Sequence, residues 1–425
     1  MAKNQLIEVW CFGQEIGRLG MDENQRQSYF QYHPDFLKKD QFRQLFPQTG
    51  IIKRVTSVQV FKQYFNETFR GLPPMIADSL PDMFGNIIFK TWLEANEQSF
   101  RQISVLEQLA YVANRGMGAL EYRPSKEILG DTSIDLAEIL TVLKEVLSSK
   151  KTVQYQNLNH QTLLNIFKIG TSAGGARPKI LLSEHKKTGA IIAGDLLVSE
   201  DYHHYLVKLS IEEELDYPRE VIEYAYYLTA TKLGIRMMPS KLIDDLHFST
   251  LRFDRQQGEK QHILTASGLT GWDFKTAEHA SYENLFELAL FLKIPHRSIE
   301  ELFRRMVFNV VFCNMDDHLK NHSFIYDATT DRWDLSPAYD LTYSLNPLLQ
   351  YKRTSRALSI NGKRVDLKQA DLLTIADTFT IKNAKNVLAE VQEAIGFWKR
   401  TTLELDVSLK VVDSMERQFL RFGNV

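Results

Sequence analysis

The stretch Asn314-Met315-Asp316-Asp317-His318-Leu319-Lys320-Asn321, followed further along by Tyr339-Asp340, carries most of the information about this chain. Asp316 precedes Asn321 by five positions, and Asp340 lies nineteen positions beyond Asn321. Kinase-type phosphoryl transfer uses a carboxylate beside the attacking hydroxyl, an Asn on magnesium and a second Asp that joins the metal to the nucleotide phosphates. Such oxygen ligands suit Mg²⁺, which is a hard ion. The spacing therefore predicts a kinase catalytic centre.

The residues around this stretch predict a rigid scaffold. Residues 307–312 form an apolar run that we expect to be buried, and residues 323–326 and 333–335 have the composition of short strands around a turn at 327–331. A buried element, a polar loop and a hairpin that returns a carboxylate can hold catalytic groups in place. The pattern departs from that of eukaryotic-type kinases, because no His-Arg pair precedes the first Asp and no Phe-Gly pair follows the last.

Length and composition restrict the class of protein. A chain of 425 residues exceeds one ordinary core and predicts about two to three domains or lobes. The formal net charge of −2 argues against a strongly basic nucleic-acid-binding protein. Cys11 and Cys313 are the two cysteines, which excludes a disulfide framework and suits a reducing cytosol. A signal peptide and a run of about eighteen apolar residues are both absent, so we expect a cytoplasmic protein without a membrane span.

Hydrophobic patterns along the chain predict an α+β protein in three parts. We expect residues 1–122 to form a small α+β module, residues 123–258 a part rich in strands and residues 259–425 a mostly helical part. Apolar residues at helical spacing predict an amphipathic helix over residues 136–147, and a longer helix is expected over residues 219–233.

A segment with paired glycines, Thr171-Ser172-Ala173-Gly174-Gly175-Ala176-Arg177-Pro178-Lys179, is a candidate phosphate loop. Paired glycines let backbone N–H groups approach phosphates, while Ser172 offers a hydroxyl and Arg177 and Lys179 offer charge. A Gly-Gly turn between two elements is more often only a turn, and the spacing of a Walker A loop is absent. Both interpretations stay open on the residues alone.

Lys208 lies inside an otherwise apolar run, Tyr205-Leu206-Val207-Lys208-Leu209. In a kinase it would be the nucleotide-anchoring lysine, with Glu223 of the following helix as its acidic partner. On an ordinary strand it would face solvent. The run Thr250-Leu251-Arg252-Phe253-Asp254-Arg255 closes the strand-rich part, where a kinase has the hinge whose backbone binds adenine.

Taken in order, these segments resemble the HipA family, the serine/threonine kinase toxins of bacterial HipBA-type toxin–antitoxin modules. The resemblance covers nearly the whole chain, and it is carried by residues 172–179, Lys208, residues 252–254, residues 316–321 and Tyr339-Asp340. It implies a two-lobed fold of the protein-kinase-like (phosphoinositide-kinase-like) type. In that fold, residues 1–122 are the N-terminal HipA-type subdomain, 123–258 the kinase N-lobe and 259–425 the helical C-lobe.

The resemblance also implies roles for matching residues. Asp316 matches the catalytic Asp, His318 the loop His that approaches the phosphates, and Asn321 and Asp340 the magnesium ligands. Lys208 matches the nucleotide-anchoring lysine. The further ATP-binding residues that it implies are Ser172, Ala173, Gly174, Gly175, Ala176, Lys179, Leu251, Phe253, Asp254 and Lys320.

Ser172 matches the serine that family members autophosphorylate, an event that ejects the phosphate loop and switches the kinase off. At the hinge, the resemblance implies that backbone groups of Leu251 and Phe253 hold adenine and that Asp254 lies near the ribose. There are two departures. Leu251 stands where some members carry an acid, and Arg177-Pro178 replaces a Gln-Glu pair found in some members.

The function implied is that of an ATP- and Mg²⁺-dependent serine/threonine protein kinase, the toxin of a type II toxin–antitoxin module. Family targets include aminoacyl-tRNA synthetases, and a HipB-like helix-turn-helix antitoxin is the expected partner and carries the DNA contact. Three alternatives stay open. One is a small-molecule or phosphoinositide kinase, the second an inactive binding scaffold or co-repressor, and the third a metal-dependent hydrolase built on Asp316, Asp317, His318 and His322.

Overall fold

The structure is a computed structural model. It describes residues 6–47, 51–81, 83–95, 99–125, 137, 139–141, 143, 177–194, 199–211, 217–345 and 355–423. The chain forms two compact units. The first contains Met1–Ile211, Ser249–Leu264 and Gly268–Gly271, and the second contains Glu212–Phe248, Thr265–Ser267 and Trp272–Val425.

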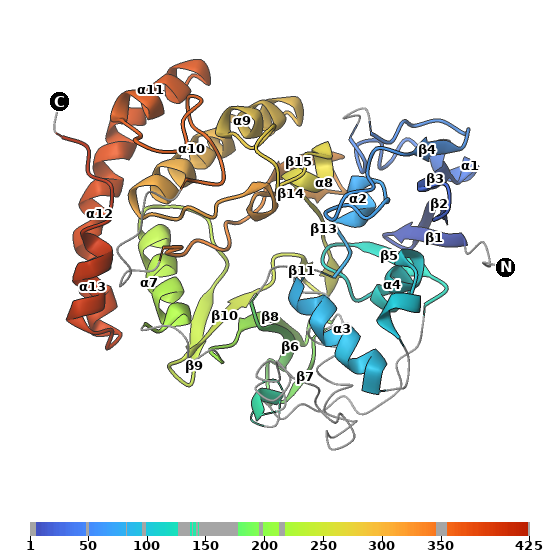
Figure 1. The fold of residues 1–425 in the computed structure, drawn as a ribbon, viewed down its shortest axis with the longest axis horizontal. Coiled ribbons are helices and arrows are strands. Elements are labelled where there is room, and N and C mark those ends of the chain that lie inside the picture. Colours follow the sequence, from blue (N-terminus) through green and yellow to red (C-terminus); the bar gives the residue numbers. More distant parts are fainter. Residues whose placement is uncertain are drawn as a thin grey trace. The chain divides into compact units, whose positions relative to one another are not determined.

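The N-terminal part of the first unit is built on a five-stranded antiparallel sheet in the order β4-β3-β2-β1-β5 (Figure 1). The alternating side chains of β1 that point inward are fully or almost fully buried, as a half-covered sheet requires. Helix α4 packs on this sheet and begins with a capping box, in which Ser104 and Glu107 bond each other's backbone N–H groups at 3.1 and 2.9 Å. The strands are β1 (Leu6–Cys11), β2 (Gln14–Asp22), β3 (Gln27–Tyr32), β4 (Gln59–Phe61) and β5 (Leu120–Arg123), and the helices are α1 (Pro34–Leu37), α2 (Pro74–Ala77), α3 (Met83–Ala95) and α4 (Val105–Val112).

A second sheet of the first unit contains the predicted nucleotide-anchoring lysine. The sheet has five strands, of which this unit contains β7 (Ile191–Ala193), β6 (Lys179–His185), β8 (Tyr202–Lys208) and the last three residues of β10 (His247–Leu251), in this spatial order. β6 and β8 are antiparallel, with Lys179 opposite Lys208. A short hairpin follows the sheet, formed by β11 (Arg255–Gln256) and β12 (Glu259–Lys260), and β13 (His262–Thr265) comes next.

The second unit is mostly helical, and α12 is the longest helix described in it. This helix packs against α7, α10, α11 and α13 (Figure 1). Its Trp398 is fully buried against Tyr226 and Phe419. The helices are α7 (Arg219–Lys232), α9 (Tyr282–Phe291), α10 (His296–Val311), α11 (Gln369–Thr378), α12 (Ala384–Glu404) and α13 (Leu409–Glu416). The strands of this unit include β9 (Ser240–Ile243), β14 (Ser323–Asp327) and β15 (Arg332–Leu335).

Several local predictions are confirmed. The hairpin expected at residues 323–335 is β14 paired antiparallel with β15, and the helix expected at residues 219–233 is α7. The apolar run at residues 307–312 is buried as the last turns of α10 and its cap. The helix predicted over residues 136–147 falls on a segment of which the structure describes only 137, 139–141 and 143.

In the described part of the chain, no helix is long and apolar enough to cross a membrane.

Candidate active site

A loop between α10 and β14 carries the motif that dominates the sequence. Cys313 enters it with a positive φ of 53°, and the backbone N–H of Asn314 donates to the carbonyl of Asn309 at 3.0 Å. The Asn314 side chain donates to Asn309 Oδ1 at 3.1 Å, which ties the loop to the end of α10. The loop closes in a short 3-10 helix, Leu319–Asn321, before β14 begins.

A buried ion pair between Arg356 and Asp317 supports this loop. Arg356 donates to Oδ2 of Asp317 at 2.9 Å and to the carbonyl of Asn314 at 3.0 Å, and the Tyr282 hydroxyl donates to the same carboxylate oxygen at 2.6 Å. The Tyr282 hydroxyl in turn accepts from Asn309 at 3.0 Å. Burial raises the pKa of Tyr282 well above its usual value, and the neighbouring Asp317 raises it further, so the hydroxyl remains a donor.

Asp316, the neighbour of the buried Asp317, is exposed. Its carbonyl accepts two hydrogen bonds, from the His318 N–H at 2.9 Å and from Nδ2 of Asn321 at 2.9 Å. The second bond matters for metal binding. Because Nδ2 of Asn321 is used by the loop itself, Oδ1 remains as the acceptor that can face a cation.

The hairpin β14–β15 brings Asp340 to the same loop. The carbonyl of Asp340 accepts from Nδ2 of Asn314 at 3.3 Å, and the neighbouring Tyr339 hydroxyl donates to the carbonyl of Lys320 at 2.7 Å. Asp340 has a positive φ of 57°, which is uncommon for a residue other than glycine. Backbone strain of this kind persists where the surrounding structure imposes it, and it is frequent at functional sites. Asp340 and Asn321 are therefore attached to one loop.

The donor set fits magnesium. A carboxylate on Asp340 and an amide oxygen on Asn321 are hard ligands, and Mg²⁺ commonly takes one or two protein ligands together with waters and substrate phosphates. His318 and Lys320 lie beside the ring of Phe274, with the His318 ring centroid 4.8 Å and Lys320 Nζ 5.3 Å from the Phe274 centroid. Two nitrogen-bearing side chains are thus held next to the predicted metal ligands, where phosphate oxygens would need donors.

Two of the four residues of the hydrolase alternative, Asp317 and His322, are buried. Asp317 is 1% exposed and bound to Arg356, so its carboxylate serves the loop rather than a metal. Burial lowers the pKa of His322 to about 4, and that imidazole is neutral and enclosed at pH 7. Among the residues that the structure describes, no group of three or more His, Cys, Asp and Glu is placed to hold a metal ion.

In the first unit, two lysines occupy one face of the β6–β8 pair. Lys179 and Lys208 are directly opposite each other and are 5% and 6% exposed. The alternative in which Lys208 faces solvent from an ordinary strand is therefore wrong. The ion pair predicted between Lys208 and Glu223 stays a prediction; Glu223 is itself buried, at 2% exposed.

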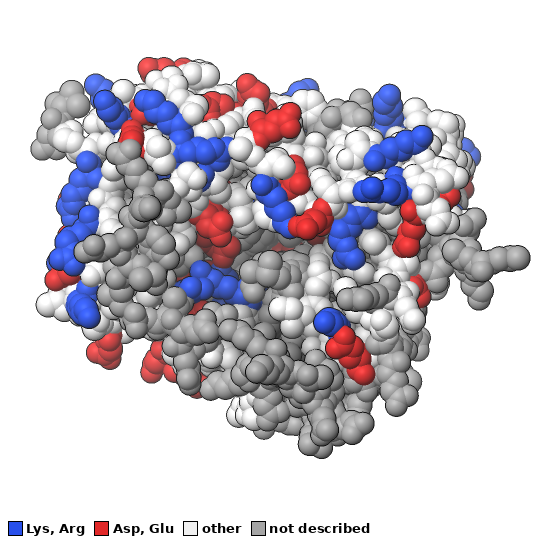
Figure 2. Space-filling view, in the orientation of Figure 1, with Lys and Arg blue, Asp and Glu red and all other residues white. Residues whose placement is uncertain are grey.

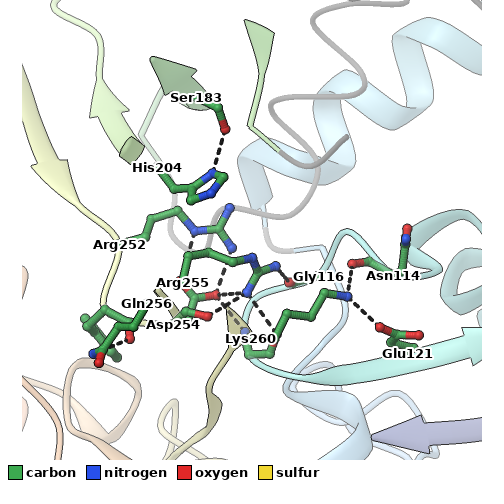
Figure 3. Close-up of polar contacts among 12 residues, drawn as sticks. Asn114, Gly116, Glu121, Ser183, His204, Arg252, Asp254, Arg255, Gln256 and Lys260 are labelled. Atoms are coloured by element: carbon green, nitrogen blue, oxygen red, sulfur yellow. Dashed lines mark hydrogen bonds and ion pairs between the residues drawn. The ribbon is translucent and has the colours of Figure 1, made fainter. Parts of the chain in front are cut away.

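The hinge residues are arranged differently from what the resemblance implied. Asp254 is fully buried, and its carboxylate accepts from Arg252 Nε and Nη2 at 2.9 and 2.8 Å, Arg255 Nη1 at 2.7 Å and the Gly118 N–H at 2.8 Å (Figure 3). Burial alone would raise the pKa of this carboxyl, but the two guanidinium groups outweigh it and hold the pKa far below its usual range. With both oxygens engaged and none exposed, Asp254 has no acceptor for a ribose hydroxyl, and we do not retain that role.

A buried histidine lies beside this cluster. His204 of β8 bonds Ser183 of β6 through Nδ1 at 2.6 Å, directly across the strand pair (Figure 3). Burial, together with the neighbouring Arg252 and Arg255, lowers the pKa of His204 to about 4. The imidazole is neutral at pH 7, so it adds no positive charge next to the two arginines.

The candidate phosphate loop, including Ser172, Ala173, Gly174, Gly175 and Ala176, lies outside the described residues. Three residues that contact the loop were not identified from the sequence, namely Arg356, Tyr282 and Phe274. Nothing in their local pattern marks them, because each acts through a residue tens of positions away. Arg252 and Arg255 on either side of Phe253-Asp254 did offer a signal, since two arginines flanking an acid are suited to a local ion pair.

Two family models match consecutive parts of the chain. The model of the HipA-like C-terminal domain matches residues 171–398, and that of the HipA N-terminal domain matches residues 7–123. The putative kinase Y4dM of Sinorhizobium fredii (strain NBRC 101917 / NGR234) is 25% identical over 233 residues, which are 50% of this chain and 56% of that protein. The chain thus matches about half the length of this curated relative.

Among solved structures, HipA from the Shewanella oneidensis MR-1 complex of HipA, HipB and operator DNA matches with a TM-score of 0.62 and 16% identity, covering 97% of each chain. The Helicobacter pylori proinflammatory kinase CtkA matches 51% of this chain and 84% of its own at 13% identity, with a TM-score of 0.36. The first match shows the fold and confirms the predicted α+β, kinase-like class. With more than half of its residues matched by the C-terminal domain model and the N-terminal part by its own model, the chain belongs to the HipA family.

Proposed function

We propose that this protein is an ATP- and Mg²⁺-dependent serine/threonine protein kinase that acts in the cytoplasm as the toxin of a toxin–antitoxin module. The observation that carries the proposal is the anchored loop of the second unit. Asp316 is exposed in this loop, while Asn314, Asp317 and Asn321 are bonded to the loop and its buried supports. A loop held in this way presents one carboxylate in a fixed position, as a general base requires.

Each residue has a separate task in this proposal. Asp316 orients the substrate hydroxyl and accepts its proton as the new P–O bond to the γ-phosphorus forms and the bond from that phosphorus to the leaving ADP breaks. Oδ1 of Asn321 and the carboxylate of Asp340 hold magnesium, which when bound neutralises charge on the phosphates. Lys208 and Lys179 bind phosphate oxygens, and the backbone at Leu251 and Phe253 binds adenine. Positioning and charge stabilisation supply most of the catalysis in this class of reaction.

A HipB-like helix-turn-helix antitoxin is the proposed partner, because HipA of Shewanella oneidensis was solved together with HipB and operator DNA. We propose that DNA contact comes mainly through that partner. The chain has a formal net charge of −2, and Figure 2 shows Lys and Arg side chains interspersed with Asp and Glu over the drawn face. The proposed substrate is a translation-related protein such as an aminoacyl-tRNA synthetase.

Ser172 is the proposed autophosphorylation site. A phosphoserine adds about −1.5 to −2 charges at pH 7, which repels nucleotide phosphates if the loop stays over them. The modified loop would therefore leave the nucleotide, and the kinase would switch off. Mass spectrometry after incubation with MgATP tests this. Phosphate on Ser172 in the native sequence and none on Ser172 in Asp316→Asn would support the switch. Kinase activity on other proteins without phosphate on Ser172 would reject the switch.

The kinase proposal itself is tested by phosphate transfer from radiolabelled ATP to the protein and to proteins of a cell extract. We expect transfer by the native sequence, little by Asp316→Asn and normal transfer by Asp377→Asn. Asp377 is a suitable control because it is an exposed Asp of the same unit, on α11. Undiminished transfer by Asp316→Asn would reject the catalytic assignment. Transfer to small molecules or lipids, and to no protein, would favour the alternative kinase class.

A further inference from the structure

A buried ionic cluster joins the hinge segment to the N-terminal domain within the first unit (Figure 3). Asp254 is its centre, and the side chains of Arg252, Asp254 and Arg255 are at most 1% exposed. Arg252 contacts the carboxylate in a bidentate manner, whereas Arg255 uses the same Nη1 for Asp254 Oδ2 at 2.7 Å and for the carbonyl of Gly118 at 3.0 Å. Arg255 therefore connects two segments that are more than 130 residues apart in sequence.

The N-terminal domain contributes backbone atoms to this cluster. Residues 113–119 link α4 to β5, and in this link Gly118 donates its N–H to Asp254 at 2.8 Å while Gly116 accepts from Arg255 Nη2 at 2.8 Å. Next to them, Lys260 Nζ donates to the carbonyl of Asn114 at 2.5 Å and to Glu121 at 2.7 Å. Charge-assisted hydrogen bonds of this kind are shorter and stronger than neutral ones.

Gly118 fits because it lacks a side chain. Its φ of +79° lies in the region that favours glycine, and a Cβ there would stand 3.2 Å from Cγ1 and 3.3 Å from the carbonyl oxygen of Ile263. An alanine at this position would displace the loop without changing any residue of the hinge. Gly13 in the β1–β2 turn has a similar φ of +71° and no neighbour within 4 Å of such a Cβ, so it offers a matched control.

The cluster also fixes the backbone that is proposed to bind adenine. The N–H of Arg252 donates to the carbonyl of His204 on β8 at 2.8 Å, and the carbonyl of Asp254 accepts from the Gln261 N–H at 2.9 Å. Phe253 lies between these two anchor points and is 9% exposed. Asp254 thus takes part in the cluster through its carboxylate and in the backbone anchoring through its carbonyl, directly beside the peptide groups of Phe253.

We propose that residues 114–118 of the N-terminal domain hold the hinge at residues 251–254 through Asp254, so that this domain sets the affinity for the nucleotide. The inference rests on the proposed kinase function. Asp254 is a positioning residue in it, and a partner that moves the α4–β5 link would weaken nucleotide binding at a distance. The N-terminal domain thereby acts on catalysis besides any role in partner recognition.

The test measures the Kd of a fluorescent ATP analogue with Mg²⁺, and the KM for ATP and kcat, on full-length variants. We expect Gly118→Ala and Asp254→Asn to raise Kd and KM by roughly tenfold, with kcat at saturating ATP within about threefold, because the catalytic loop is in the other unit. Gly13→Ala should bind as the native sequence does. Asp371→Asn should lower thermal stability without changing Kd, because Asp371 is a buried carboxylate bonded to Lys363 in the second unit.

The outcomes separate this inference from the proposed function. Normal Kd values in folded Gly118→Ala and Asp254→Asn proteins overturn the inference and leave the kinase proposal standing. If those two variants do not fold, Lys260→Met takes their place, since its ammonium donates to the carbonyl of Asn114 and to Glu121 at the two ends of the α4–β5 link. A normal Kd for that variant also overturns the inference. Failure of the native sequence to bind any nucleotide rejects the proposed function itself.

Discussion

Replacing Arg356 by Met tests the support of the catalytic loop most directly. The substitution keeps a long side chain but removes the guanidinium that donates to Asp317 Oδ2 and to the carbonyl of Asn314. Arg356 and Asp317 are 3% and 1% exposed, so the variant leaves a buried carboxylate without its cation. Removing one partner of a buried ion pair costs about 3–5 kcal/mol. We expect the free energy of unfolding of the second unit to fall by that amount.

This loss is measured by urea denaturation in one thermodynamic cycle. The cycle compares the native sequence with Arg356→Met, Asp317→Asn and the double variant Asp317→Asn/Arg356→Met. The double variant has no charge left at the site, so most of the lost stability should return. Its phosphoryl transfer should stay low, because the bond from Arg356 to Asn314 is still missing. A loss below about 1 kcal/mol in Arg356→Met would refute the reasoning, as would a double variant that is no more stable than Arg356→Met.

Three further predictions concern other sites. Asp316→Asn should bind MgATP normally and lower single-turnover phosphoryl transfer by about 10² to 10⁴, the usual contribution of a general base. Lys208→Met should weaken nucleotide binding in calorimetry by about 1.5–3 kcal/mol, the worth of a hydrogen bond to a charged group. Burial lowers the pKa of His262 to about 3 and of His322 to about 4, so the unfolded chain binds more protons below the ordinary value of about 6.5. Stability should therefore be complete above pH 6.5 and decrease as the pH falls, by roughly 2 kcal/mol per histidine at pH 5, which urea midpoints at pH 7.5 and pH 5 would measure.

Features set by neighbouring residues could be predicted from the sequence. The β14–β15 hairpin follows from two short strand-like runs on either side of a polar turn, and α7 from a long amphipathic run ended by Gly234. The attachment of Asp340 to the catalytic loop also agrees with the spacing of the motif, because a hairpin of that length returns the chain to where it started. Local propensity and spacing are sufficient for such features.

Pairings between distant residues could not be predicted in this way. Arg356 reaches Asp317 across 39 positions, and nothing in its own surroundings distinguishes it from an exposed arginine. For Asp254, the family resemblance suggested a partner other than the one that the structure shows. The family resemblance implied a ligand contact, whereas the carboxylate is consumed by Arg252, Arg255 and a backbone N–H from the N-terminal domain. Periodicity indicates that a residue is buried, but the partner of a buried charge depends on the tertiary fold.

The adjacent carboxylates Asp316 and Asp317 have opposite environments, and the loop depends on this difference. Successive side chains of an extended segment point to opposite sides, so one carboxylate can face solvent while its neighbour faces the interior. Asp317 is bound to Arg356 and Tyr282, and the carbonyl of Asp316 is held by Asn321 on the other side. A change at Asp317 would therefore displace Asp316 through the shared backbone. Loss of activity after replacing Asp316 or Asp317 therefore does not by itself identify the general base. The base is the residue whose replacement removes phosphoryl transfer and leaves the free energy of unfolding unchanged.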